Sequence, residues 1–232
     1  MKVVIFGATG FVGWAVLHEA LAAPGTTEVV SVGRRPVGVE HTKLREVIVQ
    51  DLGDLSSISS EVTGVDACFW CLGTSSQGMD EVTYTRITYA YAVDAARMLA
   101  DANPGIRFCF VSGEGADGKS MWARVKKRTE NALFAMPELR AVALRPAFIR
   151  ASHGARLRGW TYRIGYGAML LLSPLVRPFG WATSGAEIGR AMIVLAGESH
   201  DGAVFTSGDI NRLAGQLATG ATSPSSRPPS DS

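Results

Sequence analysis

A glycine-rich turn between an apolar strand and a helix constrains this chain more than any other feature. Residues 3–6 are Val-Val-Ile-Phe, typical of a buried strand, and residues 7–13 follow with glycine at positions 7, 10 and 13. Gly7 permits a tight turn, Gly10 lets the backbone approach a pyrophosphate, and Gly13 lets a helix pack closely on the sheet. The helix N-terminus adds N–H groups and a positive dipole end. This context predicts a nucleotide site, and a plain strand–helix turn is the alternative.

Two arginines follow the second predicted strand, residues 28–32. Arg34 and Arg35 come directly after Gly33, where an NAD site usually carries an acidic residue that binds the ribose hydroxyls. No acid is present at this strand end. Guanidinium groups are permanently charged and suit the 2′-phosphate of NADP. The pattern therefore favours NADP(H) over NAD(H) as cofactor, with two solvated arginines on a surface turn as the alternative.

An acidic residue follows the third predicted strand. Residues 47–52 are Val-Ile-Val-Gln-Asp-Leu, and Asp51 stands at the strand end. Its carboxylate is suited to accept a hydrogen bond from the adenine amino group. A turn residue or a helix cap is an equal alternative for Asp51.

Strands and helices alternate along the chain. The short, continuously apolar strands are typical of a parallel sheet that is covered on both faces. The alternation predicts a doubly wound α/β fold. Strands are expected near 3–6, 28–32, 44–49, 66–71, 106–111, 140–145 and 203–206, and helices near 11–22, 54–60, 80–102, 120–135 and 184–196.

Length and composition predict one domain. We expect residues 1–217 to form a single NAD(P)-binding domain, in which 146–217 contribute a small lobe on the substrate side. Residues 218–232 are rich in Ser and Pro, which predicts a disordered tail. The net charge of +2 is too small to indicate a nucleic-acid partner.

The sequence also suggests a compartment. The first apolar run is the first strand and has no cleavage-site pattern, which argues against a secretory signal peptide. The longest apolar stretch, 164–176, is too short to span a bilayer and contains Pro174. We therefore expect no transmembrane segment and a cytoplasmic protein.

Cys68 and Cys71 match a Cys-x-x-Cys pattern within the predicted strand 65–72. Redox versions of that motif use a helix N-terminus to lower the thiol pKa. Residues i and i+3 of a strand point to opposite faces, so two buried structural cysteines are expected instead. No cysteine or histidine cluster with zinc spacing is present, and no metal site is predicted. The four histidines are scattered and are expected at the surface.

Several motifs in this order resemble the extended and atypical short-chain dehydrogenase/reductase superfamily, a Rossmann-like class. The likeness is greatest to the NAD(P)-binding subgroup related to HTATIP2 and to NAD-dependent epimerases and dehydratases. It covers about residues 3–196 and is carried by residues 7–13, 33–35, 71–74, 111–117, 125–126 and 144–146.

The resemblance implies roles for individual residues. Arg34 matches the residue that meets the 2′-phosphate, Asp51 the acid on the adenine side, and residues 71–73 the segment along the cofactor ribose. Pro146 matches the proline beside the nicotinamide. The implied cofactor-binding set is Gly7, Thr9, Gly10, Phe11, Val12, Gly13, Arg34, Arg35, Asp51, Leu52, Cys71, Leu72, Gly73, Lys126 and Pro146.

The implied catalytic residues are Ser112 and Lys126. Ser112 matches the serine that steadies a substrate carbonyl or hydroxyl, and Lys126 the lysine that holds the nicotinamide ribose and lowers the pKa of a catalytic tyrosine. The tyrosine itself is missing, because Trp122 stands four residues before Lys126. Indole N–H only donates and does not exchange a proton as a phenol does. A solvated basic helix face is the alternative for Lys126.

Other groups that would replace the phenol are Tyr84, Tyr91, Glu114 or a water held by Ser112. The two tyrosines more readily pack or lie at the surface, since proton transfer needs hydrogen-bond geometry. The apolar segment 162–179 is suited to a substrate pocket or a partner contact, and a lobe core is the more common arrangement.

Two functions follow. One is an NADP(H)-dependent oxidoreductase, or an epimerase-like enzyme, that acts on a small carbonyl or hydroxyl compound with a non-standard site. The other is a non-catalytic NADP(H)-binding sensor or regulator that acts through a protein partner. A fold that serves only as an interaction module is a weaker third reading. The sequence names no substrate, and it leaves a homodimer open.

Overall fold

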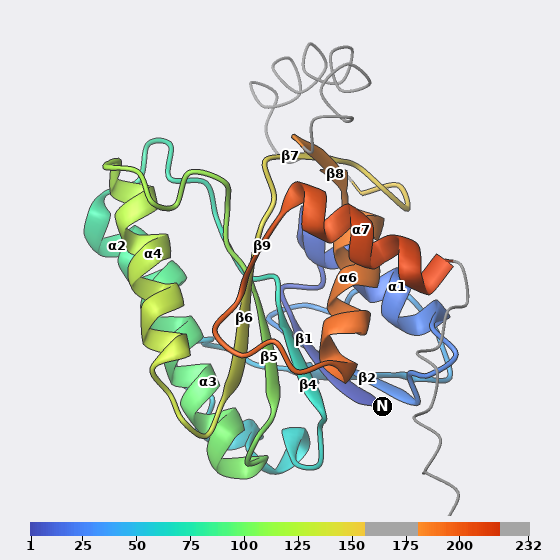
Figure 1. Ribbon diagram of the computed structural model, residues 1–232. Helices are drawn as coiled ribbons and strands as arrows, with labels where there is room; N and C mark the ends of the chain where they lie inside the picture. The colour runs from blue at the N-terminus through green and yellow to red at the C-terminus, as the bar shows by residue number, and fades with distance from the viewer. Residues whose placement is uncertain (156–180, 219–232) are drawn as a thin grey trace, which may run out of the picture.

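The structure is a computed structural model that describes residues 1–155 and 181–218. The apolar segment 162–179 and all of the predicted tail except Ala218 lie outside the described residues. Within the described part, a parallel sheet lies between two layers of helices (Figure 1).

The central sheet has seven strands in the order β3-β2-β1-β4-β5-β6-β9, and all its pairs are parallel. The chain adds β2 and β3 on one side of β1 and the later strands on the other, so the strand order reverses between β1 and β4. Ligands of doubly wound sheets usually bind at the carboxyl ends of the strands at this point. The predicted fold class is confirmed. The strands are β1 (Lys2–Phe6), β2 (Glu28–Gly33), β3 (Leu44–Ile48), β4 (Ala67–Trp70), β5 (Arg107–Val111), β6 (Arg140–Arg145) and β9 (Val204–Thr206).

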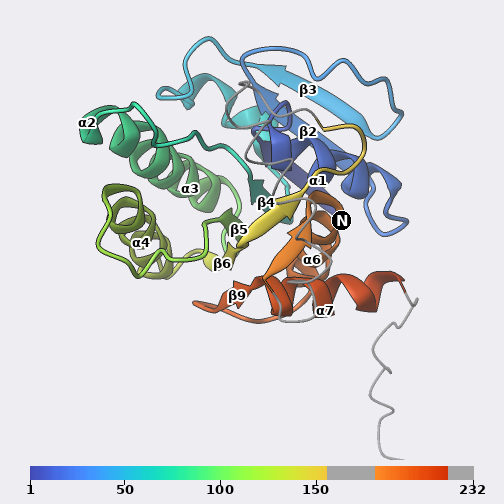
Figure 2. The ribbon, with the colours of Figure 1, turned by 90° about the horizontal axis from the view of Figure 1, so that it is seen from above.

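Helices cover both faces of this sheet (Figure 2). One layer contains α1 (Phe11–Ala22), α6 (Gly185–Gly197) and α7 (Ser207–Ala218). The other contains α2 (Glu81–Thr85), α3 (Tyr91–Ala102) and α4 (Met121–Phe134). Two further strands, β7 (Phe148–Arg150) and β8 (Ala182–Ser184), pair in parallel beyond the carboxyl end of β6.

Alternate residues of each strand enter two separate apolar cores. In β1, Val4 and Phe6 join the core beneath α3 and α4, whereas Val3 and Ile5 join the core beneath α1 and α6. All four are fully buried, and for this reason the strand is continuously apolar rather than alternating.

The structure differs from the sequence prediction in five elements. The helix expected at 54–60 is two short 3-10 helices, Ser56–Ile58 and Ser60–Val62. The helix expected at 80–102 contains a π-helical turn, Arg86–Ala90, between α2 and α3. The strands β7 and β8 and the helix α7 were not predicted. Three-residue strands have too few positions to show a period.

One of the four histidines is less exposed than expected. His41, His153 and His200 lie at the surface as expected, and the His200 side chain is 40% exposed, but His18 is half-buried. His18 stacks on His153, with 5.2 Å between the ring centroids.

A glycine contact fixes the distance between α1 and α6. A Cβ atom on Gly189 would lie 2.9 Å from Cβ of Glu19 and 3.1 Å from Cα of Val16. Gly189→Ala should therefore lower the free energy of unfolding by about 1–3 kcal/mol, measured by urea denaturation. Gly197→Ala is the matched control, because its added Cβ would meet no atom within 4 Å apart from its chain neighbours and the backbone of its own helix. An equal effect of both changes would contradict the close packing.

Candidate functional site

The glycine turn between β1 and α1 is built by backbone contacts that exclude side chains. Gly7 has φ +82°, and a Cβ there would lie 2.7 Å from N of Leu72. A Cβ on Gly13 would lie 2.1 Å from O of Gly7. The same carbonyl accepts the N–H of Gly10 at 2.9 Å. The turn thus needs glycine at 7 and 13 for steric reasons.

The N-terminus of α1 is open to an anion. Its N-cap, Gly10, makes no side-chain capping bond, and the first turn holds no acidic residue. Among the described residues, no protein group accepts the N–H of Val12 or Gly13. Amides and the positive dipole end together form a binding place for phosphate.

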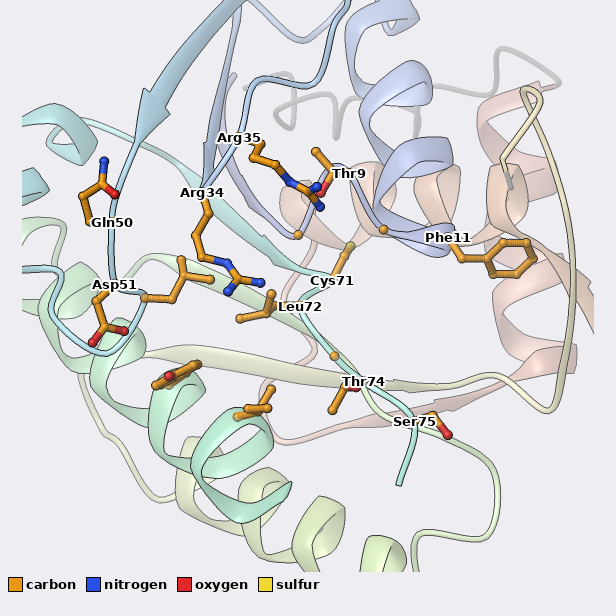
Figure 3. Close-up of a pocket in the computed structure, with 16 residues that line it drawn as sticks. Thr9, Phe11, Arg34, Arg35, Gln50, Asp51, Cys71, Leu72, Thr74 and Ser75 are labelled. Carbon is orange, nitrogen blue, oxygen red and sulfur yellow. The ribbon is translucent and has the colours of Figure 1, made fainter. Parts of the chain in front are cut away.

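A cavity of about 640 Å³ opens at this turn (Figure 3). Its walls come from the glycine turn, the ends of β2 and β3, the segment after β4, and the start of α3. It is lined by Gly7, Thr9, Gly10, Phe11, Arg34, Arg35, Gln50, Asp51, Leu52, Cys71, Leu72, Gly73, Thr74, Ser75, Ile87 and Tyr91.

Most of the predicted cofactor residues therefore meet at one cavity. Val12, Gly13, Lys126 and Pro146 belong to the predicted set but do not line it. Gln50, Thr74, Ser75, Ile87 and Tyr91 line it and were not predicted. Gln50, Thr74 and Ser75 extend segments that the sequence indicated. Ile87 and Tyr91 come from the helical layer. No sequence signal indicated Ile87, and Tyr91 was indicated only as a proton donor.

A smaller hollow of about 60 Å³ lies between the glycine turn and the end of β2. Thr9, Ser31, Arg34 and Arg35 supply its polar groups, and no carboxylate is among its lining residues. In Figure 3 the guanidinium of Arg35 lies beside Thr9, while that of Arg34 extends toward Leu72. A hollow with two guanidinium groups and hydroxyls suits a phosphate better than a diol.

Ser112 is nearly buried at the end of β5, and its hydroxyl is already paired. Ser112 Oγ donates to Glu130 Oε1 at 2.5 Å, and Glu130 is completely buried. Because its proton is used inside the protein, Ser112 presents only an acceptor to any other group.

The partner of Ser112 belongs to a charged network that joins α4 to β6. Arg145 donates from Nε to Glu130 Oε1 at 2.9 Å and from Nη2 to Oε2 at 2.5 Å. It also donates to Asp117, which pairs with Lys127 at 2.9 Å. Hydrogen bonds from Arg145 and Lys127 lower the pKa of Asp117 to about 2. The bidentate Arg145–Glu130 pair holds α4 in register.

Lys126 lies on α4 beneath the end of β5. Its Nζ donates to O of Val111 at 2.8 Å and lies 4.7 Å from the ring centroid of Phe110. Burial lowers the pKa of Lys126 to about 8, against opposing effects of Glu130 and Cys71. Cys71, which is near enough to interact electrostatically with Lys126, lines the large cavity. The ammonium group of Lys126 is therefore close to the wall of this cavity.

Trp122 lies over the loop after β5. Cβ atoms built on Gly113 and Gly115 would each lie 3.6 Å from the six-membered ring of Trp122. This loop is tied to Pro146, whose O accepts the N–H of Glu114 at 3.0 Å. Tyr84 is buried, and burial raises the pKa of its phenol.

The cysteines lie on opposite faces, as expected for a strand. Cys68 is buried in the core beneath α3, and Cys71 packs against the other core. Burial raises the pKa of all three thiols, for Cys109 to about 12. Cys71 differs from the prediction in being half-buried, with a place in the cavity wall.

The fold and the glycine turn define a nucleotide-binding protein of the Rossmann class. The model of the family described as NAD(P)H-binding matches residues 7–154, which is more than half of the chain. The chain therefore belongs to this NAD(P)H-binding family.

Named relatives agree with this assignment. The chain is 27% identical over 202 residues to Protein fmp52, mitochondrial, of Emericella nidulans, covering 83% of this chain and 85% of the relative. It is 27% identical over 197 residues to Protein HTATIP2 of Rattus norvegicus, covering 83% and 79%. The predicted resemblance to the HTATIP2-related group is confirmed.

Solved structures show the same fold. An oxidoreductase of the short-chain dehydrogenase/reductase family from Burkholderia thailandensis superposes with a TM-score of 0.70 at 14% identity, covering 95% of this chain and 98% of the other. The dTDP-glucose 4,6-dehydratase DesIV from Streptomyces venezuelae, with NAD and TYD bound, gives 0.68 at 16% identity, covering 96% and 82%.

The expected cytoplasmic location is wrong. Fungal relatives from several species carry names that place them in mitochondria. Secretory signals and membrane spans, on which the expectation rested, do not separate the cytoplasm from an organelle. In residues 1–155 and 181–218, no helix is long and apolar enough to cross a membrane.

Lys126 makes stability depend on pH. Its pKa is about 8 in the folded chain and near 10.5 when unfolded, so the folded state binds the proton less tightly. The free energy of unfolding should therefore rise between pH 8 and 10.5 relative to that of Lys126→Met. Urea denaturation across this range measures the difference between the two proteins. A difference that is constant with pH would contradict the buried ammonium.

Proposed function

We propose that this chain binds NADP(H), in preference to NAD(H), along the cavity that begins at the glycine turn. The carrying observation is the small hollow at the end of β2, where Arg34, Arg35, Thr9 and Ser31 meet without a carboxylate. Family membership supports dinucleotide binding, and the hollow supports the 2′-phosphate.

The remaining residues fit the rest of the cofactor. The amides of Gly10 to Gly13 would hold the pyrophosphate, Asp51 and Leu52 the adenine end, and Cys71 to Gly73 the ribose. Lys126, Ser112 and Pro146 stand toward the nicotinamide end in this proposal. When bound, the reduced cofactor supplies a hydride. We propose that residues 1–217 form one such domain, with part of 146–217 on the substrate side.

For chemistry, the geometry favours a binding protein over a standard reductase. Trp122 replaces the phenol, and the hydroxyl of Ser112 donates to Glu130 rather than outward. These two observations support a non-catalytic NADP(H)-dependent sensor or regulator, with a protein partner of unspecified identity.

An oxidoreductase that acts on a small carbonyl or hydroxyl compound is the second candidate. It is favoured by Lys126, which retains its place one helical turn after position 122 and has a pKa near the neutral range. In this candidate another donor, or a water, supplies the proton.

Cofactor choice is tested by titration with NADPH and NADH in parallel, followed by cofactor fluorescence. We expect tighter binding of NADPH, because the 2′-phosphate adds charge-assisted hydrogen bonds. Arg34→Glu and Arg35→Glu should each weaken NADPH binding by about ten-fold or more and affect NADH less. Arg97→Glu, on an exposed part of α3 away from the cavity, is the charge-matched control. Equal affinities for both nucleotides would contradict the NADP preference.

Trp122→Tyr separates the two candidate roles. A phenol at 122 lies on the same helix face as Lys126, so NADPH oxidation with a panel of aldehydes and ketones should rise above that of the parent chain. The double variant Trp122→Tyr, Lys126→Met should lose the gain. If the single change gives no turnover while NADPH still binds, the rest of the site is not catalytic and the binding role is favoured.

A further inference from the structure

A pair of stacked histidines joins α1 to the loop that follows β7, residues 151–155. The rings of His18, on α1, and His153, in the loop, have centroids 5.2 Å apart and planes 25° apart. Trp14, one helical turn before His18, places its ring edge-on to that of His18, with 4.6 Å between the centroids. The indole N–H of Trp14 donates to O of His153 at 2.7 Å. The loop is therefore docked on α1 by a ring pair and a hydrogen bond.

Charged side chains from α1, α6 and β7 lie around this ring pair. His153 Nε2 lies 2.7 Å from Glu19 Oε1, and because a carboxylate only accepts hydrogen bonds, this nitrogen carries a hydrogen. Arg190 of α6 lies 3.8 Å from the other oxygen of Glu19. Glu19 is thus shared between an imidazole and a guanidinium. Two further charged groups, Arg150 of β7 and Glu187 of α6, pair with each other at 3.7 Å.

His18 has no such charged partner. Its Nε2 is buried, and no group in residues 1–155 and 181–218 forms a hydrogen bond with it. Burial and the neighbouring His153 lower the pKa of His18, against an opposing effect of Glu19. A protonated imidazole carries a hydrogen on both nitrogens, so protonated His18 would bury an unpaired N–H and place a charge against the other ring. The docked loop therefore requires a neutral His18.

The docked loop also holds a residue in an unfavourable backbone conformation. His153 has φ +53°, and within the described residues it is the one non-glycine residue with a positive φ. Such conformations cost free energy and persist only where surrounding contacts hold them. Loss of the contacts with α1 would let His153 leave this conformation. Docked and released loops are therefore two distinct states, and both differ in how they accommodate a proton on His18.

We propose that His18 and His153 form a pH-sensitive clamp, which docks residues 151–155 on α1 at neutral pH and releases them when His18 takes up a proton. In the released form His18 is in contact with water and binds a proton as a free imidazole does. The docked form binds this proton less tightly, so it loses stability relative to the released form as the pH falls below about 6.5. Each further pH unit favours release about ten-fold while docked His18 stays neutral.

The clamp is tested by NMR relaxation of the backbone amides of residues 152–155 at about pH 7.5 and about pH 5. In the parent chain we expect order parameters of about 0.85 at the higher pH, as in rigid backbone, and below about 0.6 at the lower pH. The ring signals of His18 should titrate with the same midpoint as the loss of order. Circular dichroism at both pH values confirms that the domain is folded.

His18→Phe removes the proton site and retains an aromatic ring. Phenylalanine stacks on His153 and does not titrate, so the loop should stay ordered at both pH values in this variant. His41→Phe is the matched control, because His41 is exposed and lies outside the ring pair. The control should lose loop order at the lower pH as the parent chain does.

Three results would overturn the clamp. In the first, the loop of the parent chain stays ordered at the lower pH in a folded sample. In the second, His18→Phe loses order as the parent chain does, so the proton acts at another group. In the third, the loss of order and the titration of the His18 ring have clearly different midpoints. None of these measurements involves NADPH, so their outcome is independent of the proposed function.

Discussion

The backbone contact between Gly7 and Gly13 is the constraint on which the rest of the site depends. Because Gly13 has no Cβ, the first turn of α1 packs directly on the carbonyl of Gly7. Because Gly7 has none, the glycine turn packs directly on the backbone of Leu72. The open end of α1 therefore lies at the carboxyl ends of β1 and β4, where the order in which the chain adds strands to the sheet reverses. Any side chain at these positions would move the helix away from the strand ends. The position of the cavity at the strand ends follows from this contact.

The charges around the site are divided between two tasks. Arg34 and Arg35 are exposed at the end of β2, where they are accessible to a ligand. Arg145, by contrast, is nearly buried and bonded to Glu130 and Asp117, so it serves the fold. Ser112 belongs to the second group through its bond to Glu130. In the function that we propose, this arrangement and the presence of Trp122 separate cofactor binding from the proton transfer that a reductase needs.

Much of the fold was predictable because its signals are local. Continuous apolar runs predicted the strands, and the turn at 7–13 predicted the nucleotide end of the cavity. Tyr91 was considered only as a proton donor, because α-helical periodicity carries no sign of the π-helical turn before it. The bond from Ser112 to Glu130 joins residues 18 positions apart, and it depends on how α4 packs against the sheet. Such pairings are set by tertiary packing, so a single sequence does not reveal them.

We propose that the open end of α1 holds the pyrophosphate of the cofactor. Amide hydrogen exchange of Val12 and Gly13, followed by NMR with and without saturating NADPH, tests it most directly. We expect exchange at these two amides to slow by about ten-fold or more, because each gains a phosphate acceptor, while amides of α7 are unaffected. Unchanged exchange at Val12 and Gly13, in a sample where fluorescence shows NADPH to be bound, would contradict it.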